Sequence, residues 1–154
     1  MKVFRRIGVS VLVVFLTIGL CYCEAWGLFD KARAVFHYNK GHSYQEKGQW
    51  DKAIAEYNEA IKLDPKFAEA YMTRGNVYIQ KDQFDQAFSD FNKALEINPK
   101  LAGAYMIRAM AYWYNGEYDK AWEDAHNAQS LGGQVNPVFL ENLQNLLQSS
   151  GRQR

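Results

Sequence analysis

Three histidines are the first residues to consider for chemistry, because histidine is the usual side chain for metal binding and acid–base catalysis near neutral pH. His37 and His42 are five residues apart, whereas two histidines that share a metal on one helix are four apart. His126 follows an acidic pair, Glu123 and Asp124, which is typical of a solvent-facing helix surface. We therefore expect neither a metal site nor a histidine-based catalytic site.

Motifs for nucleophilic catalysis and for phosphate binding are also missing from the sequence. Cys21 and Cys23 are its two cysteines, so the rest of the chain has no disulfide framework, cysteine zinc site or thiol nucleophile. No serine is placed with a base, and no glycine-rich phosphate loop is present. The charge is nearly balanced, with 18 Lys and Arg against 17 Asp and Glu, while nucleic-acid binding needs a basic face. The sequence predicts no enzyme activity, no cofactor and no nucleic-acid partner.

The N-terminal segment opens with the basic stretch MKVFRR and continues with an uncharged apolar run at residues 7–23. The run is long for the core of a signal peptide and just reaches the lower limit for a membrane span. Cleavage before Trp26 would leave a secreted or periplasmic protein, and an uncleaved run would anchor the protein with its basic end in the cytoplasm. Residues 1–25 are thus predicted to be a signal peptide or a signal anchor. Both alternatives place the remaining chain outside the cytoplasm.

The elements that must position any site come from an internal repeat of 34 residues. The stretches GQWDKAIAEYNEAIKLDPK, DQFDQAFSDFNKALEINPK and GEYDKAWEDAHNAQSLGGQ align at this constant offset. Small residues and aromatics recur, and a proline follows the first two stretches' helical pattern, which predicts helix–turn–helix units that end at proline. The recurring sets are Gly41, Gly75 and Ala109; Tyr44, Tyr78 and Tyr112; Trp50, Phe84 and Tyr118; Ala53, Ala87 and Ala121; and Ala60, Ala94 and Ala128.

At these residues the chain resembles the tetratricopeptide repeat family, over roughly residues 34–148. The resemblance implies an all-α solenoid of three repeats, in which paired helices pack closely where their small residues meet. The expected organisation is a signal or anchor segment at 1–25, a linker or start of the first helix at 26–33, repeats at 34–67, 68–101 and 102–135, a capping helix at 136–148, and a frayed tail at 149–154.

The third repeat and the segment after it depart from the pattern. Ala125 replaces the aromatic found at Tyr57 and Phe91, so the last second helix is expected to pack more loosely or differently. After it, Asn136 and Pro137 are a typical helix start. Leu143 then stands where the repeats have glycine or alanine, which leaves no room for a further second helix. We therefore predict a lone helix that caps the stack, as solenoids require.

The resemblance also implies a binding surface, because first helices line the inner wall of this fold. Along the predicted wall the side chains change from polar and aromatic to strongly apolar. Methionine adapts to varied partners and tryptophan is frequent at binding hot spots. We expect a non-catalytic scaffold that holds a peptide or partner helix in a concave groove. The candidate groove residues are Tyr38, His42, Met72, Asn76, Met106, Met110 and Trp113.

Some members of the family bind the C-terminal carboxylate of chaperones with cationic and amide side chains on this wall. The corresponding positions here contain no cation, so chaperone tails are disfavoured as ligands; these positions are Tyr38, His42, Thr73, Gly103 and Ile107. Two alternatives remain open for the apolar wall. In the first, the terminal helix or the EAWGLF segment covers it internally, since exposed apolar patches are normally hidden or used. In the second, the groove joins copies of the chain into a homo-oligomeric structural unit.

Overall fold

The computed structural model of the protein describes residues 27–149 and residue 151. This part of the chain contains seven helices and no strand. The N-terminal helix is described over residues 27–46. It is followed by α2 (Trp50–Leu63), α3 (Ala68–Gln80), α4 (Phe84–Ile97), α5 (Ala102–Tyr114), α6 (Tyr118–Ser130) and α7 (Pro137–Ser149).

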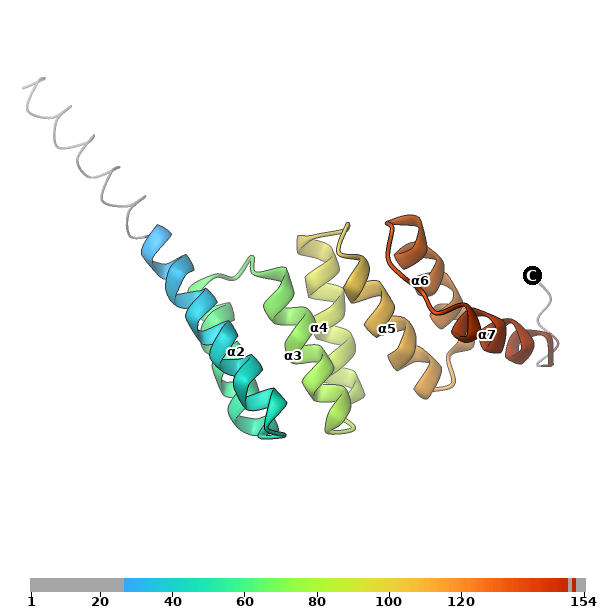
Figure 1. Ribbon diagram of the computed structural model, residues 1–154, viewed down its shortest axis with the longest axis horizontal. Helices are drawn as coiled ribbons and strands as arrows, with labels where there is room; N and C mark the ends of the chain where they lie inside the picture. The colour runs from blue at the N-terminus through green and yellow to red at the C-terminus, as the bar shows by residue number, and fades with distance from the viewer. Residues whose placement is uncertain (1–26, 150, 152–154) are drawn as a thin grey trace, which may run out of the picture.

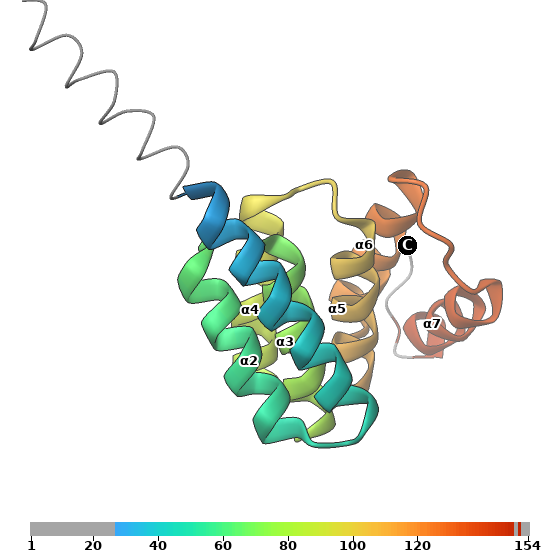
Figure 2. The same ribbon diagram turned by 60° about the vertical axis from the view of Figure 1, so that its left-hand side comes forward.

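The helices form consecutive antiparallel pairs that stack side by side, with α7 at the far end (Figure 1; Figure 2). The N-terminal helix pairs with α2, α3 with α4, and α5 with α6. The first helices of the pairs follow one another across one face of the stack, the face toward the viewer in Figure 1. The prediction of an all-α solenoid of helix pairs is confirmed.

The predicted signal or anchor segment, residues 1–25, lies outside the described residues. Among the helices of residues 27–149, none combines the length and the apolar character needed to cross a membrane. Residues 27–33 are helical and continue directly into the first repeat, so this segment is the start of the first helix and not a separate linker.

The turn within each helix pair has the same backbone conformation. Gly48, Asp82 and Gly116 follow one another at the 34-residue spacing and have φ angles of 67°, 56° and 77°. Glycine enters this left-handed region without steric cost, and aspartate is among the few other residues that tolerate it. The repeated Gly or Asp is therefore explained by the turn that reverses the chain.

Glycines allow the helices of the first two pairs to approach each other. A Cβ atom added at Gly41 would lie 2.6 Å from Cε1 of Tyr57, and one at Gly75 would lie 2.8 Å from Cε1 of Phe91. Both rings are fully buried. Each aromatic ring thus occupies the space that a side chain on the facing helix would need.

Replacing Gly75 with alanine is expected to lower the free energy of unfolding by about 1–3 kcal/mol, because the new methyl group overpacks the rigid Phe91 ring. Gly103→Ala is a matched control on an exposed helix position, where the new Cβ would meet only Met72 Sδ at 3.4 Å. This control should stabilise the protein by up to about 1 kcal/mol through helix propensity. Urea unfolding of both variants tests the pair, and a neutral Gly75→Ala would contradict the close approach of α3 and α4.

The third pair is packed by a different combination of side chains. Ala109 and Ala125 face each other where the earlier pairs have glycine and an aromatic ring, and all of the side chain of Leu143 is buried beside them. Leu143 belongs to α7, which begins after Asn136, whose Oδ1 accepts a hydrogen bond from the backbone N–H of Val138 at 2.9 Å. The different packing expected for the last pair is thus completed by a leucine from α7.

Candidate peptide-binding face

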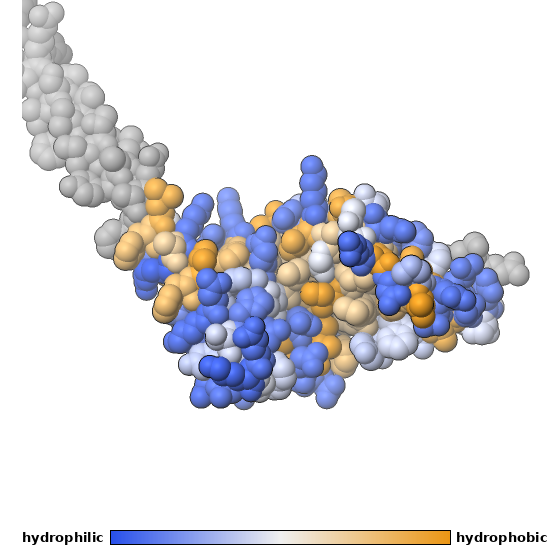
Figure 3. Space-filling model, in the orientation of Figure 1, coloured by the Kyte–Doolittle hydropathy of each residue, from blue (hydrophilic) through white to orange (hydrophobic). Residues whose placement is uncertain are grey.

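The first helices of the three pairs, the N-terminal helix, α3 and α5, form a continuous surface that we call the first-helix face. Apolar surface gathers in the middle of this face over α3 and α5, whereas the lower part of the N-terminal helix is hydrophilic (Figure 3). Met110 on α5 is 40% exposed, which is unusual for a methionine in a region of packed helices. The centre of the face is therefore apolar and accessible.

At the N-terminal end of the face, Tyr38 and His42 are brought together with Thr73 in one hydrogen-bonded network. His42 Nε2 lies 3.1 Å from the Tyr38 hydroxyl, which lies 3.3 Å from Thr73 Oγ1. Thr73 Oγ1 donates to the backbone carbonyl of Glu69 at 2.7 Å. The Thr73 proton is used there, so the Tyr38 hydroxyl donates to Thr73 and accepts from His42.

This network determines which hydrogen-bond donors remain at three positions. In some members of the resembled family, these positions bind the C-terminal carboxylate of a ligand. The hydroxyl protons of Tyr38 and Thr73 are both donated inside the protein. Thr73 is also only 5% exposed. These positions present no lysine or arginine and no free hydroxyl donor to a ligand carboxylate.

Aromatic packing holds the network in place. The Tyr38 ring centroid lies 4.9 Å from that of Phe67 and 5.8 Å from that of Tyr57. The hydroxyl of Tyr57 donates to Gln45 Oε1 at 2.8 Å, and burial raises the pKa of Tyr57 well above its usual range. Tyr57 is therefore a neutral hydrogen-bond donor. The rings of Tyr57 and Phe67 together hold the Tyr38 ring in position.

Phe67, which is not among the predicted groove residues, precedes α3 and packs against Tyr38. The sequence contains a pattern that indicates this residue. Leu101 and Val135 follow Phe67 at the 34-residue spacing, and both pack against the buried clusters of their own repeats. An apolar residue therefore recurs just before α3, α5 and α7.

The middle of the face contains the other methionine and amide candidates. Met72 packs against a buried cluster between α4 and α5, and its Sδ lies next to Gly103 on α5. Asn76 and Met106 are half-buried on α3 and α5. Met110 is the most exposed of the predicted groove residues. Met72 therefore joins neighbouring helices, and Met110 is the side chain most available to a partner.

Trp113 lies where α5 meets α7. Its ring centroid is 6.3 Å from that of Phe139 on α7 and 5.0 Å from that of Tyr114. The indole Nε1 is buried, and it is the only buried side-chain nitrogen or oxygen among the described residues for which no hydrogen-bond partner is found. The terminal helix thus covers this end of the apolar wall, as one of the sequence-based alternatives proposed, and Trp113 is shared between the face and the packing of α7.

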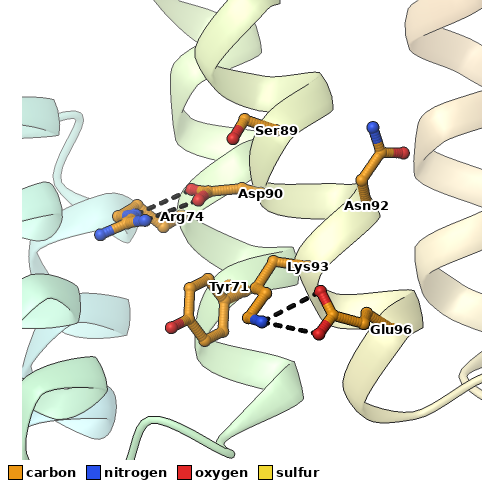
Figure 4. Close-up of a pocket in the computed structure, with 7 residues that line it drawn as sticks. All are labelled: Tyr71, Arg74, Ser89, Asp90, Asn92, Lys93 and Glu96. Carbon is orange, nitrogen blue, oxygen red and sulfur yellow. Dashed lines mark hydrogen bonds and ion pairs between the residues drawn. The ribbon is translucent and has the colours of Figure 1, made fainter.

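A second polar site lies between the helices of the second pair (Figure 4). The Arg74 guanidinium donates to both carboxylate oxygens of Asp90, at 2.7 and 2.5 Å, and to Asn58 Oδ1 on α2 at 2.5 Å. Its ring neighbours are Tyr71 and Tyr78, with centroids 5.6 and 5.8 Å from the guanidinium carbon. The charged and amide side chains that line this shallow pocket already hydrogen-bond within the protein; they are Arg74, Asp90, Asn92, Lys93 and Glu96.

The same arrangement recurs one repeat later. Arg108 donates to both oxygens of Asp124, at 2.6 and 2.8 Å, and to Asn92 Oδ1 on α4 at 2.6 Å. We call these two sets of contacts the arginine ladder. Because each arginine bonds its own pair and the preceding one, the ladder is a scaffold for the stack and not a ligand site.

In the first repeat, Glu56 takes the acidic position of the ladder. Lys40 Nζ lies 2.6 Å from Glu56 Oε1, and His37 Nδ1 lies 2.7 Å from Glu56 Oε2. Burial alone would raise the pKa of Glu56, but the hydrogen bonds from Lys40 and His37 outweigh it and hold the pKa below its usual range. His37 thus has a structural partner.

His126 hydrogen-bonds with the carbonyl of Trp122 at 3.0 Å, and no cluster of three or more metal-binding side chains occurs within the described residues.

The fold and the face define a class of helical repeat protein, and comparison with known proteins gives its family. The sequence matches the family descriptions "TPR repeat" over residues 41–82 and "Tetratricopeptide repeat" over residues 68–101. A search of curated proteins found no match. The structure of the Arabidopsis OM64 TPR domain is similar at 30% identity, over 75% of this chain and 98% of that domain, with a TM-score of 0.71. The chain belongs to the tetratricopeptide repeat family.

Two further similar structures contain peptide or chaperone ligands. The first TPR of Spaghetti (RPAP3), bound to the HSP90 peptide SRMEEVD, is 25% identical over 79% of this chain and 95% of that one, with a TM-score of 0.71. The TPR2B domain of yeast Sti1, in a complex with pHsp70, is 29% identical over 80% of this chain and 99% of that one, with a TM-score of 0.65. Proteins with this fold thus include domains that bind peptides.

Proposed function

We propose that this protein is a non-catalytic scaffold that binds an apolar peptide or partner helix on its first-helix face. The carrying observation is the accessible apolar centre of the face at Met110, whereas Tyr38, His42 and Thr73 at the N-terminal end of the face hydrogen-bond with one another. The peptide complexes of the similar TPR domains support the kind of partner. The Arg74 and Arg108 contacts support a rigid scaffold behind the face.

The side chains on the face suggest which partner chemistry it accepts. A ligand whose main anchor is a C-terminal carboxylate would find no cation at Tyr38, His42 or Thr73. A ligand with apolar anchors would bury them against Met110 and its neighbours at about 25 cal/mol per Å² of apolar surface removed from water. We therefore expect binding to follow apolar side chains in the partner.

We further propose that the repeats work outside the cytoplasm, either tethered through residues 7–23 or released after cleavage before Trp26. The basic start and the uncharged run of the sequence support this location. Mass spectrometry of the protein from its native host separates the two forms: an intact start supports a tether, and a chain that begins at Trp26 supports release.

The binding proposal is tested with peptides selected from a random display library on the full chain. Met110→Asp is expected to weaken the selected peptides about tenfold or more, since a charge replaces an apolar contact at the centre of the face. Val138→Asp is the control, because Val138 is 58% exposed on α7 and is not a predicted groove residue, so the affinity should not change. Isothermal titration calorimetry gives both affinities.

Two results would contradict the proposal. Tight binding of the peptide SRMEEVD would show that the face recognises a C-terminal carboxylate without lysine or arginine side chains at these positions. A concentration-dependent oligomer that Met110→Asp dissociates, measured by light scattering, would favour the self-association alternative instead. Trp113 is not used as the test position, because its contact with Phe139 makes its substitution a change in fold stability as well.

A further inference from the structure

The N-terminal helix has an apolar stripe outside the candidate peptide-binding residues. Its members follow helical spacing along one side: Leu28, Phe29, Ala32, Val35 and Phe36. The four large side chains are 70%, 64%, 48% and 63% exposed, in sequence order. Four large apolar side chains exposed on about two and a half turns of helix indicate a surface that a lipid phase or another molecule covers.

The repeat register explains why this stripe is uncovered within the described chain. Phe36 occupies the position of Ala70 in the second repeat and of Ala104 in the third. Both alanines are fully buried, and α4, which precedes the third repeat, packs in the cluster with Ala104. Phe36 therefore lies on the open end of the stack, which is formed by the N-terminal helix (Figure 1).

The open end is apolar over only part of its length, and this decides between possible occupants. Farther along the helix, Ser43 occupies the position at which Val77 and Ala111 are fully buried. Asn39 and Ser43 are both exposed and polar. A further repeat or a second copy of the chain, packed as the repeats pack on one another, would need an apolar surface along the whole helix. The stripe instead covers only the half nearest to residues 7–23.

A lipid surface fits a stripe of this extent. The stripe begins shortly after the uncharged run at residues 7–23 and is about 12 Å long at 1.5 Å per residue. Lys31 and Arg33 are exposed beside it. Arg33 pairs with Asp30 at 3.3 Å, so Lys31 is the cation placed to reach lipid phosphates. Helices with apolar and aromatic residues on one side and basic residues next to them lie in the plane of the membrane interface.

We propose that the side chains of Leu28, Phe29, Val35 and Phe36 insert into the interface of the membrane that residues 7–23 enter. This inference rests on the tethered form of the proposed function. It would fix the open end of the stack at the membrane and leave α7 and the Met110 region directed away from the lipid surface.

The test uses the full chain in vesicles of phosphatidylcholine and phosphatidylglycerol, with photoreactive p-benzoylphenylalanine in place of Phe36. Irradiation should give lipid adducts at this position, identified by mass spectrometry. The same residue in place of Val138 is the matched control, because Val138 is 58% exposed on α7 at the other end of the stack. No lipid adduct above background is expected there. Replacing Leu28 and Phe29 together with serine should reduce the adduct yield at position 36 while the helicity stays unchanged.

The possible outcomes separate the parts of the proposal. Vesicle flotation first shows whether residues 7–23 hold the chain on the membrane, and a chain that does not float overturns the inference. A floating chain that crosslinks to a second copy, crosslinks within itself, or gives no adduct at position 36 overturns the stripe as a lipid contact. Peptide binding at Met110 is measured independently, so its loss or persistence tests only the scaffold function.

Discussion

Replacing Leu143 with alanine is expected to lower the stability of the C-terminal part of the fold by about 2–5 kcal/mol. The side chain of Leu143 is fully buried between α7 and the third helix pair, where it fills the space beside Ala109 and Ala125. The buried alanines beside it are too short to fill the cavity that the substitution leaves. Native-state hydrogen exchange of the α7 and α6 amides measures the loss directly.

Val138→Ala provides the comparison for Leu143→Ala. Val138 lies on the same helix but is 58% exposed, so its truncation should change the exchange of α7 by only a few tenths of a kcal/mol. Equal effects of the two substitutions would mean that α7 is not held in place by Leu143. The cap would then owe its position to other contacts, such as that between Trp113 and Phe139.

Asp90→Asn is expected to cost about 3 kcal/mol of unfolding free energy. The substitution keeps the shape of the side chain but removes the charge that pairs with Arg74 through two hydrogen bonds. The side chains of Arg74 and Asp90 are only 17% and 7% exposed, so water cannot replace the lost partner at little cost. Urea unfolding followed by circular dichroism gives the change.

An ion pair on the same helix serves as the control for Asp90→Asn. Lys93 and Glu96 also form two hydrogen bonds, but their side chains are 43% and 69% exposed. Glu96→Gln should therefore leave the unfolding midpoint almost unchanged, because solvent screens such pairs. If Asp90→Asn were equally silent, the buried pair would not contribute to the stack. If Arg74→Leu combined with Asp90→Leu recovered the loss, the cost would belong to the unpaired charge.

The repeat itself could be predicted from the sequence because its physical requirements recur at one spacing. Close helix contact needs a small residue at Gly41 and Gly75, and the left-handed turn needs glycine or aspartate at Gly48, Asp82 and Gly116. Each requirement is local or lies within one repeat. The helix pairs and the helical cap could therefore be placed from residue type alone.

The candidate site was less predictable because its contacts depend on how neighbouring elements dock. Tyr38 hydrogen-bonds with Thr73, which is 35 residues away in the sequence. No residue type indicates that a tyrosine hydroxyl and a threonine hydroxyl will form a hydrogen bond there. Trp113 was placed on the open wall by its repeat position. Its contact with Phe139 depends on the path of residues 131–136, where Gly133 replaces the proline of the earlier repeats, so the position of α7 does not follow from the repeat.

The arginine ladder has a consequence for the way in which the protein opens. Arg74 and Arg108 each bond to an asparagine of the preceding pair, Asn58 and Asn92, so adjacent repeats share hydrogen bonds as well as apolar contacts. In a one-dimensional stack such nearest-neighbour coupling determines how many repeats unfold together. The next positions in the series are His126 and Asn142, which cannot continue the ladder. The three helix pairs should thus unfold as one cooperative unit, and α7 should detach at lower free energy, so that the boundary of cooperativity falls between α6 and α7.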